Sequence, residues 1–315
     1  MSSRRAGFLP IALAIVFMSL GGCLRQMPTR SELNAQLAAA LEKGDLASAQ
    51  LALKQGADAN AETRFGWTPL SLAAGRHDPK MAAMLLDYGA NATALDSNGE
   101  TPVDAAIRMA DAPVAAVLLR SGADRESLNR YLFEAARGLS VVTIANGNAN
   151  FSATSIPPNP VISLLVKKGA DVNTRDEQGS TPLEEAAAYG QTASTEALIE
   201  NNADIEARDN FGNTPLLAAS YDDAVATMPD TIDAVNLLLE KGADINARNN
   251  EGDTALIIAS GGGVVKIQIV KALIEHGADL RAKNKKGETA LAVAERDQVT
   301  GVIPLLKAAL QSKRR

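Results

Sequence analysis

The sequence predicts an all-α solenoid of about eight helix-turn-helix units with short β-hairpin turns. The first observation is a Gly-Ala-Asp motif, or a near copy of it, that recurs at intervals of 33, 33, 47, 33, 40 and 35 residues. The second is a Thr-Pro-Leu motif, or a near copy, that keeps step with the first. Self-similarity at such a period is typical of stacked repeats. The Gly-Ala-Asp copies begin at Gly56, Gly89, Gly122, Gly169, Asn202, Gly242 and Gly277, and the Thr-Pro-Leu copies at Thr68, Thr101, Thr181, Thr214, Thr254 and Thr289.

Each unit is predicted to contain two helices. Thr-Pro starts the first, because threonine is a good N-cap and proline fits the first helical position, where its missing N–H has no partner. The alanine-rich residues that follow, such as Ala73 and Ala74, allow helices to approach closely. The second helix carries a bulky apolar run, such as residues 237–239, and the glycine of Gly-Ala-Asp ends it in the left-handed conformation. The Asp/Asn-x-x-Gly runs between units are predicted turns.

The two end units differ from the others. The first, around Leu37 to Asn60, lacks Thr-Pro, and the last, Thr289 to Leu310, lacks Gly-Ala-Asp. Terminal repeats have one face in water, so atypical end units are what capping requires. The repeat domain is therefore expected over residues 33–312.

Two insertions interrupt the period, and both fall between the two helices of a unit. The larger lies near 138–160 in the fourth unit, whose first helix is degenerate, and the smaller near 222–231 in the sixth. In the larger, β-branched residues flank an Asn-Gly pair, which predicts a hairpin. A hairpin that carries Ile144 and Phe151 is too apolar for plain disorder, so we expect these two residues to contact a partner. The alternative is a tolerated surface insertion.

A unit of about 33 residues with a turn, two helices and the T-P-L-x-x-A pattern resembles the ankyrin repeat. The resemblance covers residues 33–312 and implies a stack whose concave face, made of hairpin tips and first-helix ends, binds other proteins. One departure recurs, because the histidine that follows T-P-L in the family is absent from every copy. We expect this to weaken the stack somewhat without changing the fold. The residues in its place are Ser71, Asp104, Glu184, Leu217, Ile257 and Ala292.

The resemblance places a set of arginine, lysine and aromatic residues on the concave face. Tryptophan, tyrosine and arginine are the residue types enriched at binding hot spots. We therefore expect partner contacts from this set, although Trp67 and Phe211 have the alternative of simply covering the neighbouring hairpin. The set is Arg64, Phe65, Trp67, Arg76, Arg175, Tyr189, Arg208, Phe211, Tyr221, Arg248 and Lys283.

Four of these residues form a ladder of cations, because they occupy the same site in four consecutive repeats. On an otherwise acidic chain, such a row is suited to steer an acidic partner and fix its register. The alternative is that it reflects a common hairpin sequence, in which Lys or Arg precedes Asp or Asn. The ladder consists of Arg175, Arg208, Arg248 and Lys283.

The N-terminus has the pattern of an export signal. Residues 1–22 combine a basic start with an apolar stretch of secretory length, too short to cross a membrane, which predicts a signal peptide. The Leu-Gly-Gly-Cys tetrad that ends at Cys23 resembles the lipobox of bacterial lipoproteins, which implies that Cys23 is lipidated and anchors the chain to a membrane. Residues 23–32 would then form a polar tether. The alternative is an ordinary cleaved signal or an uncleaved anchor.

The same resemblance predicts the compartment. It places the mature chain on a membrane that faces the periplasm. Leu24 follows the cysteine where an aspartate would favour inner-membrane retention, so we expect the periplasmic side of the outer membrane, with the inner membrane as the alternative.

The composition excludes several classes of function. A net charge of −6, from 37 acidic and 31 basic residues, is unsuited to nucleic acid. One cysteine and two distant histidines, His77 and His276, leave no multi-cysteine metal site and no zinc-hydrolase spacing. The sequence also contains no nucleophile elbow and no phosphate-binding loop. We therefore expect no enzymatic activity, no metal, no cofactor and no small-molecule substrate.

These observations together predict a non-catalytic, membrane-anchored binding protein of the periplasm. Periplasmic lipoproteins built from repeats resemble immunity proteins, so we expect the partner to be a secreted antibacterial toxin that this chain binds and inhibits. The alternative partner is a resident periplasmic enzyme, for which the chain would be a scaffold or assembly factor, as ankyrin-like proteins linked to catalase indicate. Neutralisers usually need a tight 1:1 interface, whereas scaffolds can bind weakly.

Overall fold

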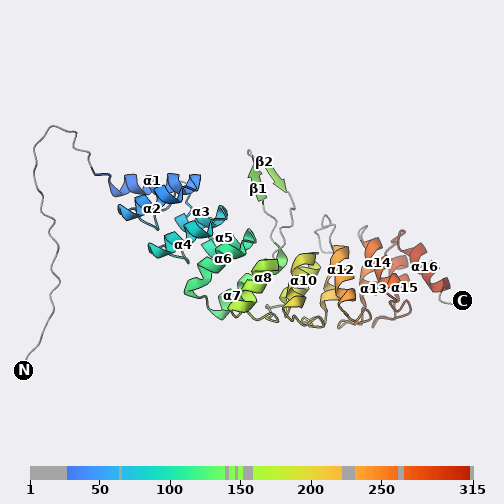
Figure 1. Cartoon of the computed structure of the whole chain (residues 1–315). Coiled ribbons are helices and arrows are strands. Elements are labelled where there is room, and N and C mark those ends of the chain that lie inside the picture. The colour runs from blue at the N-terminus through green and yellow to red at the C-terminus, as the bar shows by residue number, and fades with distance from the viewer. Residues whose placement is uncertain are drawn as a thin grey trace, which may run out of the picture.

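The structure, a computed structural model, shows an elongated stack of helix pairs (Figure 1). Helices α1 to α16 form eight consecutive pairs, which we number as units 1 to 8. The first helix of each pair packs against the first helix of the next, and the second helices pack likewise from α2 to α14. The predicted all-α solenoid of about eight units is therefore confirmed. The structure describes residues 27–63, 66–138, 142–145, 148–151, 159–221, 231–261 and 266–312.

The first helix of each unit, called the inner helix, begins at a threonine N-cap wherever the Thr-Pro-Leu motif or its near copy occurs. In each of these six units the threonine side chain accepts a hydrogen bond from the N–H three residues on. The predicted helix starts are confirmed. The inner helices are α1 (Arg30–Lys43), α3 (Pro69–Gly75), α5 (Pro102–Arg108), α7 (Arg125–Arg137), α9 (Pro182–Ala188), α11 (Pro215–Ala218), α13 (Ala255–Ala259) and α15 (Ala290–Arg296).

The inner helices pack closely because alanine recurs at one register position. The fifth residue after the capping threonine is alanine in all six of these units, and each of these alanines is at most 1% exposed. A methyl group there lets neighbouring backbones approach, as predicted. The six are Ala73, Ala106, Ala186, Ala219, Ala259 and Ala294.

The second helix of each unit, called the outer helix, supplies the larger apolar side chains of the core. In units 2 to 7 a leucine lies four residues before the first residue of the Gly-Ala-Asp motif, and each is at most 1% exposed. Burial of one such side chain contributes about 1.5–3 kcal/mol. The outer helices are α2 (Leu46–Lys54), α4 (Pro79–Asp87), α6 (Ala112–Leu118), which a 3-10 turn η1 (Leu119–Ser121) extends, α8 (Asn159–Lys168), α10 (Thr192–Glu200), α12 (Thr231–Glu240), α14 (Lys266–Glu275) and α16 (Ile303–Ser312).

The Gly-Ala-Asp motif ends the outer helices as the sequence predicts. In unit 6, Gly242 has φ 94° and the N–H of Ala243 donates to the carbonyl of Leu238 at 2.9 Å. This is the 6→1 bond of a Schellman motif. Asn202 in unit 5 adopts the same left-handed conformation with φ 65°.

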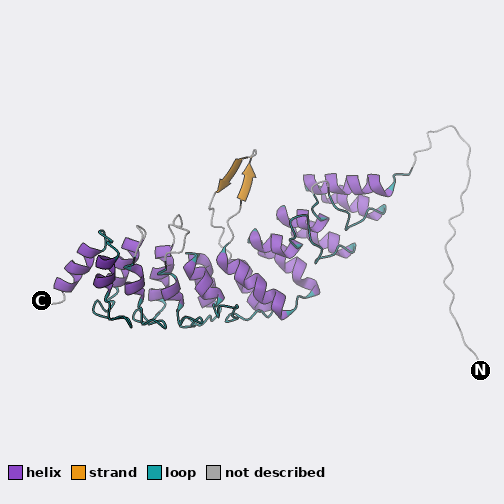
Figure 2. Ribbon diagram, turned by 180° about the vertical axis from the view of Figure 1, so that it is seen from behind, coloured by secondary structure: helices purple, strands orange, loops and turns teal. Residues whose placement is uncertain are grey.

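Hairpin loops connect the outer helix of one unit to the inner helix of the next. Each loop is closed by a backbone bond across its tip, as from Asp209 N–H to the Asn213 carbonyl at 3.0 Å and from Asn249 N–H to the Asp253 carbonyl at 3.1 Å. From unit 5 onward the loops lie side by side along one edge of the solenoid (Figure 2).

The junction between units 3 and 4 is different. Asp124 of the Gly-Ala-Asp motif is itself the N-cap of α7 and accepts from Ser127 N–H at 2.7 Å. The inner helix of unit 4 therefore follows the outer helix of unit 3 almost directly, without a hairpin loop between them. The direction of the stack changes at this junction (Figure 1).

The larger insertion contains the predicted hairpin. Strand β1 (Val142–Ala145) pairs antiparallel with β2 (Asn148–Phe151), and the pairing of Ala145 with Asn148 leaves a two-residue connection. The hairpin projects from the edge of the solenoid opposite to the hairpin loops (Figure 2). Residues 222–230 of the smaller insertion lie outside the described residues.

The first helix begins at Arg30, three residues before the predicted start of the repeat domain at residue 33. Thr29 caps α1, because its side chain accepts the Glu32 N–H, and Glu32 Oε2 in turn accepts the Thr29 N–H at 2.7 Å. Residues 30–32, assigned above to the tether, therefore belong to α1. Cys23 and the signal segment lie outside the described residues. Of the helices that the structure describes, none has both the length and the apolar character needed to cross a membrane.

Candidate functional site

Four aromatic side chains expected at the binding surface are exposed in the structure. They lie on the inner face, which we define as the open side of the inner helices together with the adjoining hairpin loops. Trp67 precedes α3 and is 38% exposed, Tyr189 follows α9 and is 40% exposed, Phe211 lies in the loop before α11 and is 64% exposed, and Tyr221 follows α11 and is 40% exposed. Exposed apolar rings of this kind are available to a partner.

Two of these four side chains share one cavity. Phe211 and Tyr221 line one cavity of about 350 Å³ between the loops of units 6 and 7. The side chain of Asn249 holds the tyrosine in place, because its Nδ2 donates to Tyr221 Oη at 2.9 Å and to Asn213 Oδ1 at 3.2 Å. Tyr221 Oη in turn donates to Asn213 Oδ1 at 3.3 Å. Neither asparagine is among the contact residues predicted from the sequence.

The arginines of the predicted ladder join successive hairpin loops. Arg208 Nη1 donates to the carbonyl of Gly212 in its own loop at 2.8 Å and to that of Arg248 in the next loop at 2.6 Å. Arg175 makes the equivalent pair of bonds, the second of them to the Arg208 carbonyl. Arg248 continues the series to Lys283 at 2.6 Å. The arginines thus have a structural role, and their contact with an acidic partner stays a prediction.

The structure describes some of the remaining residues predicted to contact a partner, and others lie outside the described residues. Lys283 ends the ladder and accepts the bond from Arg248 through its carbonyl. Arg76 Nη1 donates to the Glu42 carbonyl at 2.6 Å, so this side chain joins the ends of α3 and α1. Arg64 and Phe65 lie outside the described residues. For Ile144 and Phe151 only the strand pairing is described.

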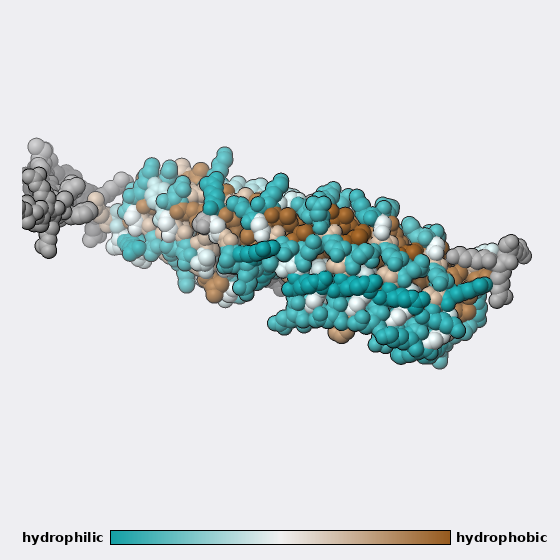
Figure 3. All heavy atoms as spheres, turned by 90° about the horizontal axis from the view of Figure 1, so that it is seen from below, coloured by the Kyte–Doolittle hydropathy of each residue, from teal (hydrophilic) through white to brown (hydrophobic). Residues whose placement is uncertain are grey.

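Backbone bonds between neighbouring loops reinforce the hairpin edge. Asn210 N–H donates to the Gln178 carbonyl at 3.0 Å, and Asn250 N–H donates to the Phe211 carbonyl at 2.8 Å. Viewed from this edge, the surface is mostly hydrophilic, with a band of apolar residues along the length of the stack (Figure 3). Because the loops are fixed to one another, a partner that binds them loses little free energy to ordering them.

Paired charges occupy the middle of the inner face. Arg130 of α7 contacts Asp104 of α5 at 2.9 Å and Glu134 of its own helix at 2.6 Å. Arg137 of α7 contacts Glu185 of α9 at 2.8 Å. These pairs bridge units 3, 4 and 5 across the junction that lacks a hairpin loop. Exposed pairs of this kind contribute about 0–1 kcal/mol each, so they align the units more than they stabilise them.

Glu184 is a buried acid on the same face of the stack. It takes the place of the histidine that the resemblance expects, and only 3% of it is exposed. Its Oε2 accepts the Thr181 N–H at 2.7 Å, whereas its buried Oε1 has no hydrogen-bond partner among the described residues. Burial raises the pKa of Glu184 to about 7, with a further contribution from Asp209, while Thr181 and Arg175 act in the opposite direction. The carboxyl group therefore changes its charge near neutral pH.

A histidine and an aspartate meet at the joint between units 2 and 3. His77 Nδ1 lies 2.8 Å from Asp111 Oδ2, and Asp111 also caps α6 by accepting Val114 N–H at 3.0 Å. The aspartate is thus occupied with holding a helix end. In the described ranges, no group of three or more His, Cys, Asp and Glu side chains is arranged to hold a metal ion.

Comparison with known families agrees with this geometry. The family profile for ankyrin repeats, described as three copies, matches residues 37–129, 151–249 and 223–313, which is well over half of the chain. A comparison with curated proteins gives no significant match. Ankyrin repeats are generally protein-interaction modules and typically lack catalytic activity. From its repeat pattern, its stacked helix pairs and this match, the chain belongs to the ankyrin-repeat family.

Proposed function

We propose that this chain is a non-catalytic lipoprotein of the periplasm that binds one protein partner through its inner face. The observation that carries the binding proposal is the pair Phe211 and Tyr221, two exposed rings over one cavity on a hydrogen-bonded edge. Aromatic anchors beside fixed polar groups are the usual composition of a protein-binding hot spot. The proposed anchor is a lipid on Cys23, which the lipobox sequence supports, and the proposed site is the periplasmic side of the outer membrane.

We propose further that the partner is a secreted antibacterial toxin, which the chain neutralises. A surface fixed before binding favours the tight 1:1 complex that neutralisation needs. An anchor on the membrane would hold the inhibitor where such a toxin arrives.

A capture experiment tests the binding surface. Residues 24–315 serve as bait in periplasmic extract, and captured proteins are identified by mass spectrometry. Trp67→Ala with Phe211→Ala is expected to lower partner capture at least tenfold. The matched control combines Leu51→Ala in α2 and Tyr88→Ala directly after α4, which remove exposed apolar side chains from the outer-helix side and should leave capture unchanged. Equal capture by both double variants would refute the inner-face proposal.

Activity of the captured protein then identifies the role. A secreted hydrolase held at 1:1 with its activity blocked supports neutralisation. A resident enzyme, such as a catalase, that keeps its activity in the complex would make the chain a scaffold and overturn the toxin proposal.

A separate variant tests the anchor. Cys23→Ala is expected to move the protein from the membrane fraction to the soluble periplasmic fraction. A variant that stays with the membrane would contradict lipidation of Cys23.

A further inference from the structure

One row of side chains on the inner face has a gap near its C-terminal end. The row consists of the residue seven positions after each capping threonine, which lies at the C-terminal end of the inner helix or up to three residues beyond it. Gly261 stands between Tyr221 in unit 6 and Arg296 in unit 8, so the row has no side chain in unit 7. The members of the row are Gly75, Arg108, Ala188, Tyr221, Gly261 and Arg296.

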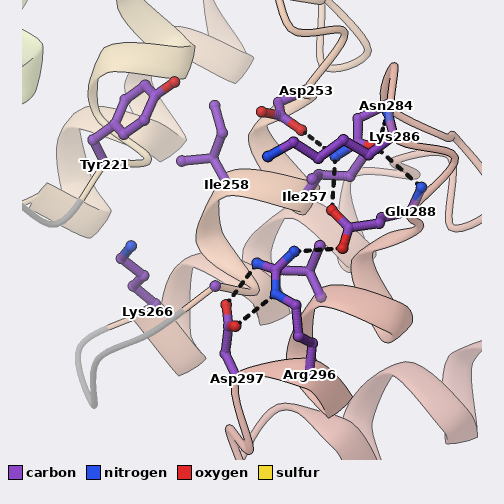
Figure 4. A pocket seen from close by; sticks show the side chains of 12 residues that line it. Tyr221, Asp253, Ile257, Ile258, Lys266, Asn284, Lys286, Glu288, Arg296 and Asp297 are labelled. Carbon is purple, nitrogen blue, oxygen red and sulfur yellow. Dashed lines mark hydrogen bonds and ion pairs between the residues drawn. The ribbon is translucent and has the colours of Figure 1, made fainter.

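The gap opens a cavity of about 250 Å³, which we call the notch (Figure 4). Its lining includes the Tyr221 ring on one side and Arg296 on the other, with Gly261 between them. Ile257, Ile258 and Val293 also line it, and each is at most 9% exposed, so they form its apolar floor.

Two neighbouring carboxylates hold the side chain of Arg296. Its Nε and Nη2 donate to the two oxygens of Asp297 at 2.8 and 3.0 Å, and its Nη1 donates to Glu288. Figure 4 shows the guanidinium group between these two carboxylates. Three of the five N–H donors, one on each nitrogen, go to these carboxylates, which fixes the plane of the group. The flat face of a guanidinium held in this way can stack on an aromatic ring.

The polar groups around the notch argue against a charged occupant. Glu288 also accepts from Asn284 at 3.3 Å, and Asn284 donates to Asp253 at 2.9 Å, so the carboxylates form one hydrogen-bonded series. Three carboxylates line the notch, which disfavours an anion. Three cations line it as well, namely Lys266, Lys286 and Arg296, which disfavours a cation.

We propose that the notch receives one aromatic side chain of the partner protein, between the Tyr221 ring and the Arg296 guanidinium. A tyrosine, tryptophan or phenylalanine ring has an apolar body for the isoleucine floor and a negative π-face for the guanidinium. This inference rests on the proposed function, because it names the chemistry that the inner face recognises in its partner.

The test uses small aromatic and aliphatic probes. Residues 24–315 are labelled with ¹³C at the isoleucine methyl groups, and N-acetyltyrosine amide is titrated into the sample. Saturable ring-current shifts of the Ile257 and Ile258 methyl signals are expected at millimolar concentration. N-acetylleucine amide should bind at least fivefold more weakly. Equal binding of the two probes, or no saturable shift at these methyl groups, would overturn the proposal.

Two glycine variants give a matched comparison. Gly261→Leu fills the notch, and among the described residues a Cβ there has only ordinary contacts, the closest with Val293 at 3.4 Å, so the helix end should be retained. Gly75→Leu adds the same side chain at the same register position in unit 2, where a Cβ has no described atom within 4 Å. We expect Gly261→Leu to abolish tyrosine-probe binding and Gly75→Leu to preserve it. Tyr221→Leu, which removes one wall, gives a second way to lose the signal if Gly261→Leu is poorly folded.

The capture experiment distinguishes failure of this inference from failure of the proposed function. If the probe does not bind the notch while Trp67→Ala with Phe211→Ala still lowers capture, only the inference that the notch receives an aromatic side chain is wrong. If the probe binds and capture is insensitive to that double variant, the inner-face function is wrong. Loss of both probe binding and partner capture in Gly261→Leu, with both retained in Gly75→Leu, supports the inference.

Discussion

Glu184→Gln should remove a pH dependence from the stability of the solenoid. Glu184 is 3% exposed and its pKa is raised from 4.5 to about 7, chiefly by burial. Each pKa unit corresponds to 1.36 kcal/mol, so ionising this group in the folded chain costs up to about 3 kcal/mol. The bond from the Thr181 N–H to Oε2 is already part of this balance, so about 2–3 kcal/mol is the expected range.

The sign follows from where the proton is held more tightly. The folded chain keeps the proton on Glu184 at pH values where the unfolded chain has released it. The stabilising contribution of the protonated group is therefore fully present below about pH 4.5 and is lost as the pH rises through about 7. Glutamine does not titrate, so the free energy of unfolding of Glu184→Gln should change less across this window.

Urea unfolding of the wild type and the variant at half-unit steps from pH 4.5 to 8.5 measures the effect. The difference between the two free energies removes the contribution of every other titrating group. Glu184→Leu is a second test, because Leu217 occupies the equivalent position in unit 6 and shows that the fold accepts an apolar residue there. The decisive quantity is the difference in free energy of unfolding between wild type and Glu184→Gln. If that difference changes by less than about 0.5 kcal/mol over this pH range, about one-fifth of the predicted effect, the reasoning is refuted.

Three further predictions concern the hairpin edge and the insertion. Arg208→Leu removes bonds to two loops, so it should lower the free energy of unfolding by about 1–3 kcal/mol even without a partner; an unchanged urea midpoint would contradict the structural role. Gly179→Ala should cost at least 1 kcal/mol more than Gly99→Ala, because both glycines have φ near 78° but only at Gly179 would a Cβ lie 2.5 Å from a neighbouring side chain; equal urea midpoints would argue against that close packing. Deletion of residues 141–155 should weaken partner binding, measured by calorimetry. Unchanged affinity would show that this segment is a tolerated surface insertion that does not contact the partner.

The fold was predictable because its signals are local and repeated. A threonine N-cap, a buried alanine, a leucine and a left-handed Gly-Ala-Asp turn each act within a few residues, and every unit restates them. The start of α1 was misplaced even though its signal is also local. Thr29 and Glu32 form a capping box, and their T-x-x-E spacing was visible in the sequence.

The site was less predictable because its contacts join different units. Asn249 meets Asn213 and Tyr221 across 36 and 28 residues, so only the stacking geometry brings them together. The sequence located the four exposed rings of the inner face, because register within a unit decides exposure. It did not show the notch, since a glycine at one register position becomes a cavity only when the side chains on either side of it are known.

The arginine ladder has two candidate roles, which are to join the hairpin loops and to attract an acidic partner. The free energies of the two kinds of interaction decide between them. Each of its arginines donates to two loop carbonyls, and a hydrogen bond with a charged partner contributes about 1.5–3 kcal/mol. A partner carboxylate that approached from solvent would gain only about 0–1 kcal/mol from an exposed pair, and less at physiological salt. The ladder therefore acts mainly to stabilise the stack, and its attraction for an acidic partner is expected to be weak. If the proposed partner binds at this edge, most of the binding energy is expected from apolar contact with the exposed rings of Phe211 and Tyr221.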